Sequence, residues 1–326
     1  MLYPKPAYVA LATLTKVLDS VQLTRQFDTG SSSAHALEFT RGKEHVYALW
    51  TPRGECEMQV ELPADSTLTL TSFYGEQRQQ PSNNKRLTVT ASSAVSYFTS
   101  PVAIKGVTAG KRRFPQQSPP PGTQIVAKMD SAADWEIATT DAKLTTKVRV
   151  PGNFTLSQQN DPEHGPCLEV ALQKCGELPA VLAEYTALRL KTPAPIPGKP
   201  HTIGMWVKGD SNWGRIMWEI DDAKGERFSS SWDMYEYGDW GNHSDLDFDG
   251  WCFVSSPLTN DSLLKHVEPG SGAKQWLSKG NGVLDYPLKL TGIYVITHRQ
   301  SLDLTKMMPV RTPLRFRDVS VMGETK

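Results

Sequence analysis

The chain has 326 residues, 39% of them hydrophobic, and its 35 basic and 35 acidic residues give a formal net charge of zero. This length exceeds one average domain, so two or three structural units are expected. The balanced charge gives no indication of nucleic acid or of an anionic membrane as a partner. No apolar run reaches the ~20 residues that a membrane-spanning helix needs.

The first predicted element is one amphipathic helix within residues 4–19. Pro6 suits the first helical turn, and Tyr8, Leu11 and Leu18 recur at helical spacing. No partner helix is predicted downstream. The ordinary interpretation is a helix that docks on the sheet that follows it.

Residues 20–110 predict a small antiparallel β-sandwich, because apolar and polar residues alternate with period two between turn signals. The alternating segments are 36–39, 45–50, 56–62, 67–70 and 87–89. Residues 111–123 follow, rich in proline and without an apolar period. That composition is typical of a semi-rigid linker.

Residues 124–326 predict a second, larger β-sandwich of about ten strands, a number that fits a jelly roll. Strand patterns occur at 148–150, 167–172, 185–190, 288–295 and 314–321. In the stretch 204–258, two alternating segments end in turn residues and predict a hairpin. A third strand follows Gly250, with Trp251 and Phe253 on one face. The predicted fold class is therefore all-β, with two sandwiches and one N-terminal helix.

An aromatic and acidic insert, residues 232–240, lies between the second and third of these strands and, together with neighbouring residues, provides the candidate binding residues. Exposed indole and phenol rings stack on pyranose rings, and neighbouring polar side chains satisfy sugar hydroxyls. The candidate carbohydrate-binding residues are Trp213, Arg215, Trp232, Tyr235, Tyr237, Trp240 and Asn242. The alternative is an Ω-loop whose rings pack inward on its own chain.

No standard catalytic constellation is visible, so no catalytic residue is assigned. The chain has no Gly-x-Ser-x-Gly, His-Glu-x-x-His, phosphate-binding loop or Gly-x-Gly-x-x-Gly pattern. The alternative is that the chain is an enzyme, a polysaccharide lyase or hydrolase whose active site consists of Tyr235, His243 and Arg215. No Cys-x-x-Cys pair indicates zinc. Cys167 and Cys175 lie on either side of a possible turn, and both a disulfide and separate thiols remain open.

Short signatures along the chain resemble parts of glycoside hydrolases. The order Trp206-Val207-Lys208-Gly209-Asp210, then Asp222-Ala223-Lys224-Gly225, then Asp249-Gly250-Trp251, resembles the β-jelly-roll carbohydrate-binding modules with a galactose-binding-like fold. Pro4-Lys5-Pro6-Ala7-Tyr8 resembles the start of the last helix of a (β/α)8-barrel hydrolase. Val46-Tyr47-Ala48-Leu49-Trp50 resembles the small sandwich that caps such a barrel.

This resemblance implies a non-catalytic, polysaccharide-binding accessory region of a glycoside hydrolase. Its partners would be a polysaccharide or oligosaccharide and an upstream catalytic barrel. The full-length protein would be secreted or at the cell surface, although the first residues of this chain show no signal peptide. The resemblance also implies a structural Ca2+ with Asp130, Glu136 and Asp318 as candidate ligands. A surface structural or adhesion protein is the remaining hypothesis.

Overall fold

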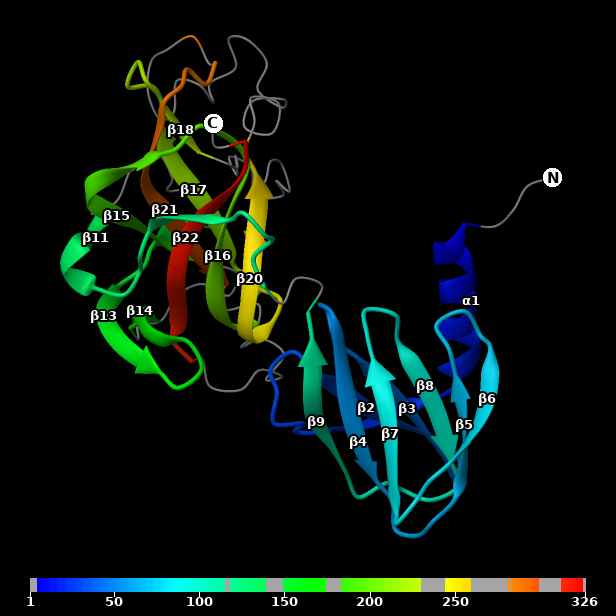
Figure 1. The fold of residues 1–326 in the computed structure, drawn as a ribbon. Coiled ribbons are helices and arrows are strands. Elements are labelled where there is room, and N and C mark those ends of the chain that lie inside the picture. The colour runs from blue at the N-terminus through cyan, green and yellow to red at the C-terminus, as the bar shows by residue number, and fades with distance from the viewer. Residues whose placement is uncertain are drawn as a thin grey trace. The chain divides into compact units, whose positions relative to one another are not determined.

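The computed structural model describes residues 5–114, 118–138, 149–173, 183–229, 244–258, 281, 283–298 and 312–324. It divides into two compact units, residues 1–115 and 116–326, which we call the N-terminal and C-terminal sandwiches. Each is built from β-strands whose pairings are antiparallel, apart from the parallel pair β12 and β15, and one α-helix lies at the start of the chain (Figure 1). The predicted fold class is therefore confirmed.

The N-terminal sandwich consists of two sheets with strand orders β1-β2-β3-β8-β5-β6 and β7-β4-β9. Its strands are β1 (Gln22–Gln26), β2 (His35–Arg41), β3 (Glu44–Trp50), β4 (Glu55–Glu61), β5 (Thr67–Thr71), β6 (Gln77–Pro81), β7 (Arg86–Ala91), β8 (Ser96–Ser100) and β9 (Gly106–Arg113). The last strand, β9, runs into the segment 111–123 that the sequence assigns to a linker.

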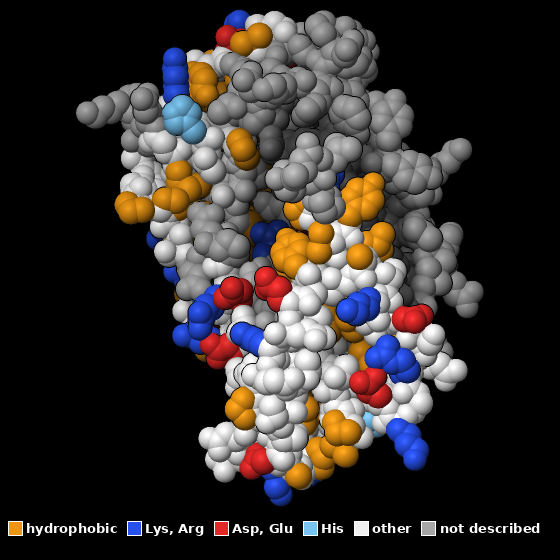
Figure 2. All heavy atoms as spheres, turned by 90° about the vertical axis from the view of Figure 1, so that its right-hand side faces the viewer, with side chains coloured by type: hydrophobic (Ala, Val, Ile, Leu, Met, Phe, Trp, Pro, Cys, Tyr) orange, Lys and Arg blue, Asp and Glu red, His pale blue; other side chains and the backbone are white. Residues whose placement is uncertain are grey.

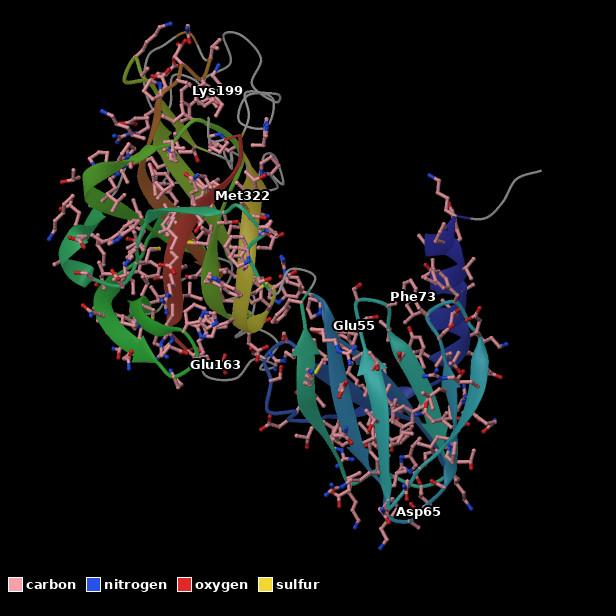
Figure 3. The ribbon with its side chains drawn as sticks, in the orientation of Figure 1. Glu55, Asp65, Phe73, Glu163, Lys199 and Met322 are labelled. Carbon is pink, nitrogen blue, oxygen red and sulfur yellow. The ribbon has the colours of Figure 1, made fainter. Side chains whose placement is uncertain are left out.

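The core of this sandwich comes from alternate residues on both sheets. Tyr47 and Leu49 of β3 and Met58 and Val60 of β4 are almost completely buried in one apolar cluster. Because successive side chains of a strand point to opposite faces, the period-two pattern of the sequence places these residues inside. Side chains drawn in Figure 3 fill the space between the two sheets.

The helix α1 (Pro6–Val17) contributes little to that core. It buries Ala10 and Thr13, whereas Tyr8, Leu11 and Leu14 are exposed. Hydrophobic side chains accordingly gather on the side of the unit that carries α1 (Figure 2). No residue of the helix belongs to the buried cluster between the sheets.

We therefore expect deletion of residues 1–19 to leave the N-terminal sandwich folded. Its apolar cluster would lose no member, so its cooperative unfolding transition should persist with nearly the same midpoint. Thermal unfolding of the truncated and full chains, followed by circular dichroism, tests this. Loss of the transition would show that α1 belongs to the core.

The C-terminal sandwich contains two sheets, which we call the β16 sheet and the β17 sheet. The β16 sheet has the order β13-β14-β22-β16-β20, with β10 paired to β22. Its strands are β10 (Gln124–Ala127), β13 (Phe154–Asp161), β14 (Gly165–Leu172), β16 (Lys199–Asp210), β20 (Asp249–Pro257) and β22 (Leu314–Glu324). A 3-10 helix, η1 (Ala132–Asp134), follows β10.

The β17 sheet has the order β11-β15-β21-β17-β18, and two short strands, β12 and β19, pair with β15 and β17. Its strands are β11 (Trp135–Ala138), β12 (Arg149–Pro151), β15 (Ala183–Ile196), β17 (Arg215–Asp221), β18 (Arg227–Ser229), β19 (Ser244–Asp245) and β21 (Leu288–His298). The inner faces of the two sheets carry fully buried side chains such as Val207, Phe316, Trp218 and Val295.

One predicted connection is wrong. The strands at 204–209 and 215–220 do not form a hairpin, because β16 pairs with β20 and β22 whereas β17 pairs with β21 in the other sheet. The turn residues between them carry the chain from one sheet to the other. The Asp222–Gly225 turn, in contrast, does join the antiparallel pair β17 and β18.

Two further expectations concern cysteines and membrane spans. Cys167 is a free and buried thiol, so it does not form the disulfide that was left open; Cys175 lies outside the described residues. Burial raises the pKa of the Cys167 thiol. In the described part of the chain, no helix is both long and apolar enough to cross a membrane.

Candidate functional site

The outer face of the β17 sheet carries a second set of buried side chains, separate from the core. Tyr185, Ala187, Met217, Tyr294 and Ile296 form a cluster of their own, and each is almost completely buried. The register places Met217 opposite Tyr294, and Tyr294 opposite Ala187, on three adjacent strands. The apolar part of this outer face is therefore itself buried, and the exposed part lies beside it.

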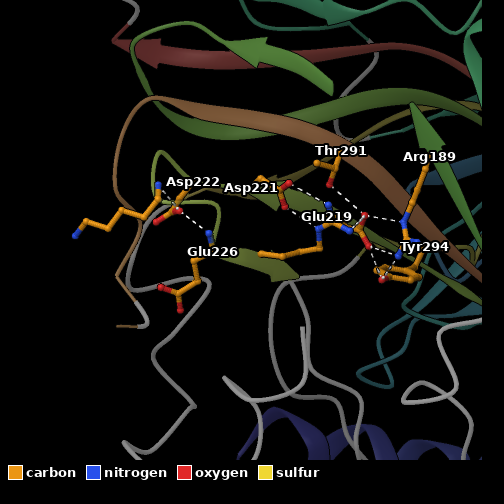
Figure 4. Close-up of polar contacts among 9 residues, drawn as sticks. Arg189, Glu219, Asp221, Asp222, Glu226, Thr291 and Tyr294 are labelled. Atoms are coloured by element: carbon orange, nitrogen blue, oxygen red, sulfur yellow. Dashed lines mark hydrogen bonds and ion pairs between the residues drawn. The ribbon is translucent and has the colours of Figure 1, made fainter. Parts of the chain in front are cut away.

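A polar network lies beside this apolar cluster, centred on the carboxylate of Glu219 (Figure 4). Arg189 donates to it twice, from Nε to Oε1 at 2.9 Å and from Nη2 to Oε2 at 2.9 Å. Thr291 donates from Oγ1 to Oε1 at 3.1 Å, and the Tyr294 hydroxyl donates to Oε2. The Arg227 Nη1 atom lies 3.6 Å from Oε1. We call these five residues the Glu219 network.

The network keeps Glu219 ionised although only 1% of its side chain is exposed. Burial alone would raise the pKa of Glu219, but hydrogen bonds from Arg189 and Tyr294 outweigh it and lower that pKa. Burial raises the pKa of the Tyr294 phenol, and the bond to Glu219 raises that of Arg189. At neutral pH the site therefore holds a fixed carboxylate, a neutral phenol and a guanidinium.

A glycine makes the bridge between Arg189 and Glu219 possible. Gly292 of β21 lies opposite both residues, between the strands that carry them. A Cβ atom at Gly292 would lie 2.3 Å from the Leu188 carbonyl oxygen and 3.2 Å from the Arg189 Cγ atom. Since the position has no side chain, Arg189 can reach across the middle strand to Glu219.

The edge of the same face extends the polar surface. Arg227 donates from Nε and Nη2 to both carboxylate oxygens of Asp221, at 2.7 and 3.0 Å. The side chains of Arg189 and Arg227 remain partly exposed. Both are held in place from below by carboxylates, so their orientation is fixed before any ligand arrives.

The sequence-predicted residues Trp213 and Arg215 lie at one end of this face. Arg215 is the first residue of β17 and shares the outer face with Met217 and Glu219 by strand alternation. Trp213 precedes it in the connection from β16, with 45% of its surface exposed and a φ of 59°. Its backbone N–H donates to the Leu246 carbonyl at 3.0 Å, which fixes the turn.

The other predicted sugar-binding residues lie outside the described residues. These are Trp232, Tyr235, Tyr237, Trp240 and Asn242, together with His243 of the enzyme alternative. The two strands that flank the insert, β18 and β19, both pair with β17. The described residues on either side of the insert therefore both belong to the sheet that carries the Glu219 network.

The three candidate calcium ligands are not brought together. Glu136 is exposed on β11, opposite Arg189 in the β17 sheet, whereas Asp318 lies in β22 of the other sheet and accepts a hydrogen bond from Arg317. In the ranges that the structure describes, no group of three or more His, Cys, Asp or Glu side chains is placed to hold a metal. Asp130, Glu136 and Asp318 therefore do not fit a shared ion, and bound calcium remains a prediction.

The Glu219 network was not predicted from the sequence. Arg189 and Glu219 each interrupt an apolar strand, in Leu188-Arg189-Leu190 and Trp218-Glu219-Ile220. A charged residue within a strand that reads as buried indicates a paired charge. That signal was available, but it does not identify which strands are neighbours.

Comparisons with protein-family models and with curated proteins find no match. Among solved structures, the chain is similar to the family 11 carbohydrate-binding module of Clostridium thermocellum in complex with a β-1,3-1,4-mixed-linked tetrasaccharide, at 11% identity. The likeness covers 63% of this chain and 97% of that one, with a TM-score of 0.35. A Bacteroides thetaiotaomicron protein, whose assignment as a glycoside hydrolase is provisional, matches at 9% identity over 94% of this chain and 95% of its own, with a TM-score of 0.28. TM-scores this low carry no argument about function, which is therefore argued from the residues of this chain.

Proposed function

We propose that the C-terminal sandwich binds a polysaccharide on the outer face of the β17 sheet. The observation that carries the proposal is the exposed ring of Trp213 at the end of a face that presents partly exposed, carboxylate-anchored guanidinium groups. An aromatic ring offers dispersion and desolvation to a sugar ring. Fixed N–H donors beside it satisfy hydroxyl groups at little entropic cost.

The conformation of Trp213 supports a role beyond folding. A non-glycine residue in the left-handed region is disfavoured by about 1–2 kcal/mol, and the large exposed ring adds an apolar surface that water does not favour. Folding alone would be served better by a glycine at this position. A ligand that covers the ring would explain why tryptophan, and not glycine, occupies this position.

The chemistry of the face favours binding over hydrolysis. A glycosidase needs a protonated carboxylic acid beside a second carboxyl group. In this site Glu219 has a lowered pKa and is held by Arg189. We therefore propose an accessory role beside a catalytic barrel elsewhere in the protein, with aromatic stacking by Trp213 and the insert residues as the mode of binding.

Replacement of Trp213 by Ala tests the binding site. We expect binding to the best glycan on an array to weaken by about 1–3 kcal/mol, by analogy with base stacking on aromatic rings. The thermal midpoint should change little, because the ring is exposed. Tyr74→Ala, at an exposed aromatic residue of the N-terminal sandwich, is the matched control and should bind like the unchanged chain. Full affinity in Trp213→Ala would remove this face as the site.

The purified chain is expected to release no reducing ends and no unsaturated products from the glycan that it binds. The physical reason is that the carboxyl group of Glu219 has a lowered pKa and is held by Arg189, so it is a poor proton donor and a weak base. A reducing-sugar assay and absorbance of unsaturated uronates measure the two kinds of cleavage. Product that disappears in Glu219→Gln would overturn the accessory role and favour a hydrolase or lyase.

A further inference from the structure

The outer face of the other sheet, the β16 sheet, carries a second group of aromatic and charged side chains. Two rows run across neighbouring strands of β14, β22, β16 and β20. The register gives Glu169, Arg315, Lys208 and Trp251 in one row and Arg317, Trp206 and Phe253 in the other. None of these residues belongs to the Glu219 network or to the β17 sheet. We call this group the Trp206 face.

An aromatic wall forms one side of the Trp206 face. The ring of His164 lies 4.4 Å from that of Trp251 in a stacked geometry and 4.7 Å from that of Trp206. Trp206 in turn meets Phe253 edge-on, with ring centroids 5.6 Å apart. Burial and the neighbouring Arg317 lower the pKa of His164, so its ring stacks as a neutral aromatic group at neutral pH.

His164 reaches this wall from the turn between β13 and β14, beside the labelled residue Glu163 (Figure 3). The turn is fixed by Asp161, whose Oδ1 atom accepts the backbone N–H of Glu163 at 3.0 Å. The other carboxylate oxygen of Asp161 accepts Lys208 Nζ at 2.9 Å and Arg315 Nη1 at 2.8 Å. One buried carboxylate thus orders both the turn and the two cations.

The ion pairs of this face present their cations outward. In each pair the side chain of the cation is more exposed than that of the carboxylate. The exposed fractions are 36% for Lys208 and 0% for Asp161. They are 26% for Arg315 and 14% for Glu169, and 30% for Arg317 and 19% for Asp318. An ammonium or guanidinium group carries more N–H donors than these bonds use. In these three pairs the N–H donors are therefore the more exposed partners, and the exposed carboxylate of Glu163 lies in the adjacent turn.

We propose that the Trp206 face is a second sugar-binding site, which takes a pyranose that carries an anionic group. The ring of the partly exposed Trp206 would pack against the C–H groups of the sugar ring. Lys208, Arg315 and Arg317 would donate to the anion. A carboxylate and a sulfate both match the planar fork of arginine, so the shared chemistry is an anionic oxygen group on a sugar.

The proposal is independent of the glycan site on the β17 sheet, because the two sites lie on different sheets and share no residue. A neutral sugar would leave the outward donors of the Trp206 face without the acceptors that they match best. A site of this kind also predicts that binding weakens with salt, since exposed charges are screened over ~3 Å at about 1 M ionic strength.

Isothermal titration of the full chain with three probes tests this site. The probes are tetragalacturonate, a κ-carrageenan tetrasaccharide and the desulfated form of that tetrasaccharide. We expect at least one anionic probe to bind, and to bind more weakly in about 1 M salt. If the anionic group is a sulfate, the desulfated tetrasaccharide should bind about tenfold more weakly than the sulfated one. Binding of tetragalacturonate alone would identify a carboxylate as the anionic group.

Variants assign the binding to the Trp206 face. Arg317→Gln and Trp206→Ala should each weaken binding of the anionic probe about tenfold. Lys105→Gln, which makes the same charge change on the N-terminal sandwich, should leave it unchanged. If Trp206→Ala fails to fold, Arg317→Gln decides the question, because its side chain is at the surface.

Three results would overturn the proposal. The first is that neither anionic probe binds the unchanged chain. The second is that the desulfated tetrasaccharide binds as tightly as the sulfated one while tetragalacturonate does not bind. The third is full affinity in Arg317→Gln, combined with loss of affinity in Trp213→Ala, which would assign the anionic sugar to the β17 sheet instead. A failure of Trp213→Ala to affect any glycan would count only against the first site.

Discussion

Replacing Arg189 by Met is expected to lower the free energy of unfolding of the C-terminal sandwich by about 3 kcal/mol at neutral pH. The reason is the fate of Glu219, which would stay buried without its bidentate partner. Removing one member of a buried ion pair typically costs about 3–5 kcal/mol. The lower end applies here because Tyr294 and Thr291 still donate to the carboxylate. Urea unfolding, followed by tryptophan fluorescence, measures the loss.

The N-terminal sandwich offers a matched control for this prediction. Arg113 donates one hydrogen bond from Nη2 to Glu57 Oε1 at 2.9 Å, the same distance as each Arg189–Glu219 bond, but both side chains are substantially exposed. Arg113→Met should therefore change stability by less than about 1 kcal/mol. Equal effects of the two replacements would show that burial of Glu219 does not set the cost.

Strands that bury one face could be predicted from the sequence, whereas strands without a buried face could not. Strand β4 alternates apolar and polar residues because one face meets the core, and its bounds could be read closely. In β3 the four consecutive residues 46–49 are all buried, so its burial does not follow that alternation. Strand β6 (Gln-Arg-Gln-Gln-Pro) lies at a sheet edge with polar, mostly exposed side chains. It has no apolar period, so no local pattern indicates a strand there.

Strand partners were harder to predict than strands. The turn residues between β16 and β17 fit a hairpin, yet the structure uses them for a crossing between sheets. The left-handed residues Ser211 and Trp213 and the close approach of Gly214 to the Ile296 carbonyl make that crossing possible. Such a choice depends on packing far along the chain, which local turn chemistry does not contain.

The same reason explains the outcome for the sites. Trp213 and Arg215 were named as candidates because an aromatic residue beside turn signals is recognisable in the sequence, and their role in binding stays a prediction. The Glu219 network joins residues 30 and 75 positions apart from Glu219, at Arg189 and Tyr294. Asp161 and Arg315 of the Trp206 face are 154 positions apart. Such clusters exist only once the strand order is fixed, so sequence spacing could not reveal them.

The second large effect is expected at Asp161, whose replacement by Asn should destabilise the C-terminal sandwich by about 2–4 kcal/mol at neutral pH. Asn keeps the acceptor for the Glu163 N–H but removes the charge that Lys208 and Arg315 share. Hydrogen bonds to charged groups contribute about 1.5–3 kcal/mol each to stability. Hydration of the two cations in the variant offsets part of that loss. Glu163→Gln, in the same turn but exposed, is the matched control and should have little effect.

The pH dependence separates this electrostatic cause from a packing defect. Burial alone would raise the pKa of Asp161, but hydrogen bonds from Lys208 and the Glu163 backbone outweigh it, and the pKa lies far below its ordinary value. A carboxyl group with a lowered folded-state pKa stabilises the fold above its unfolded-state pKa of about 3.9 and loses that contribution as the pH falls further. The stability difference between the unchanged chain and Asp161→Asn should therefore be constant from pH 7 to about 5 and shrink below about pH 4. Urea unfolding at pH 7, 5 and 3 measures it, and a difference that persists undiminished in acid would mean that Asn disturbs packing instead.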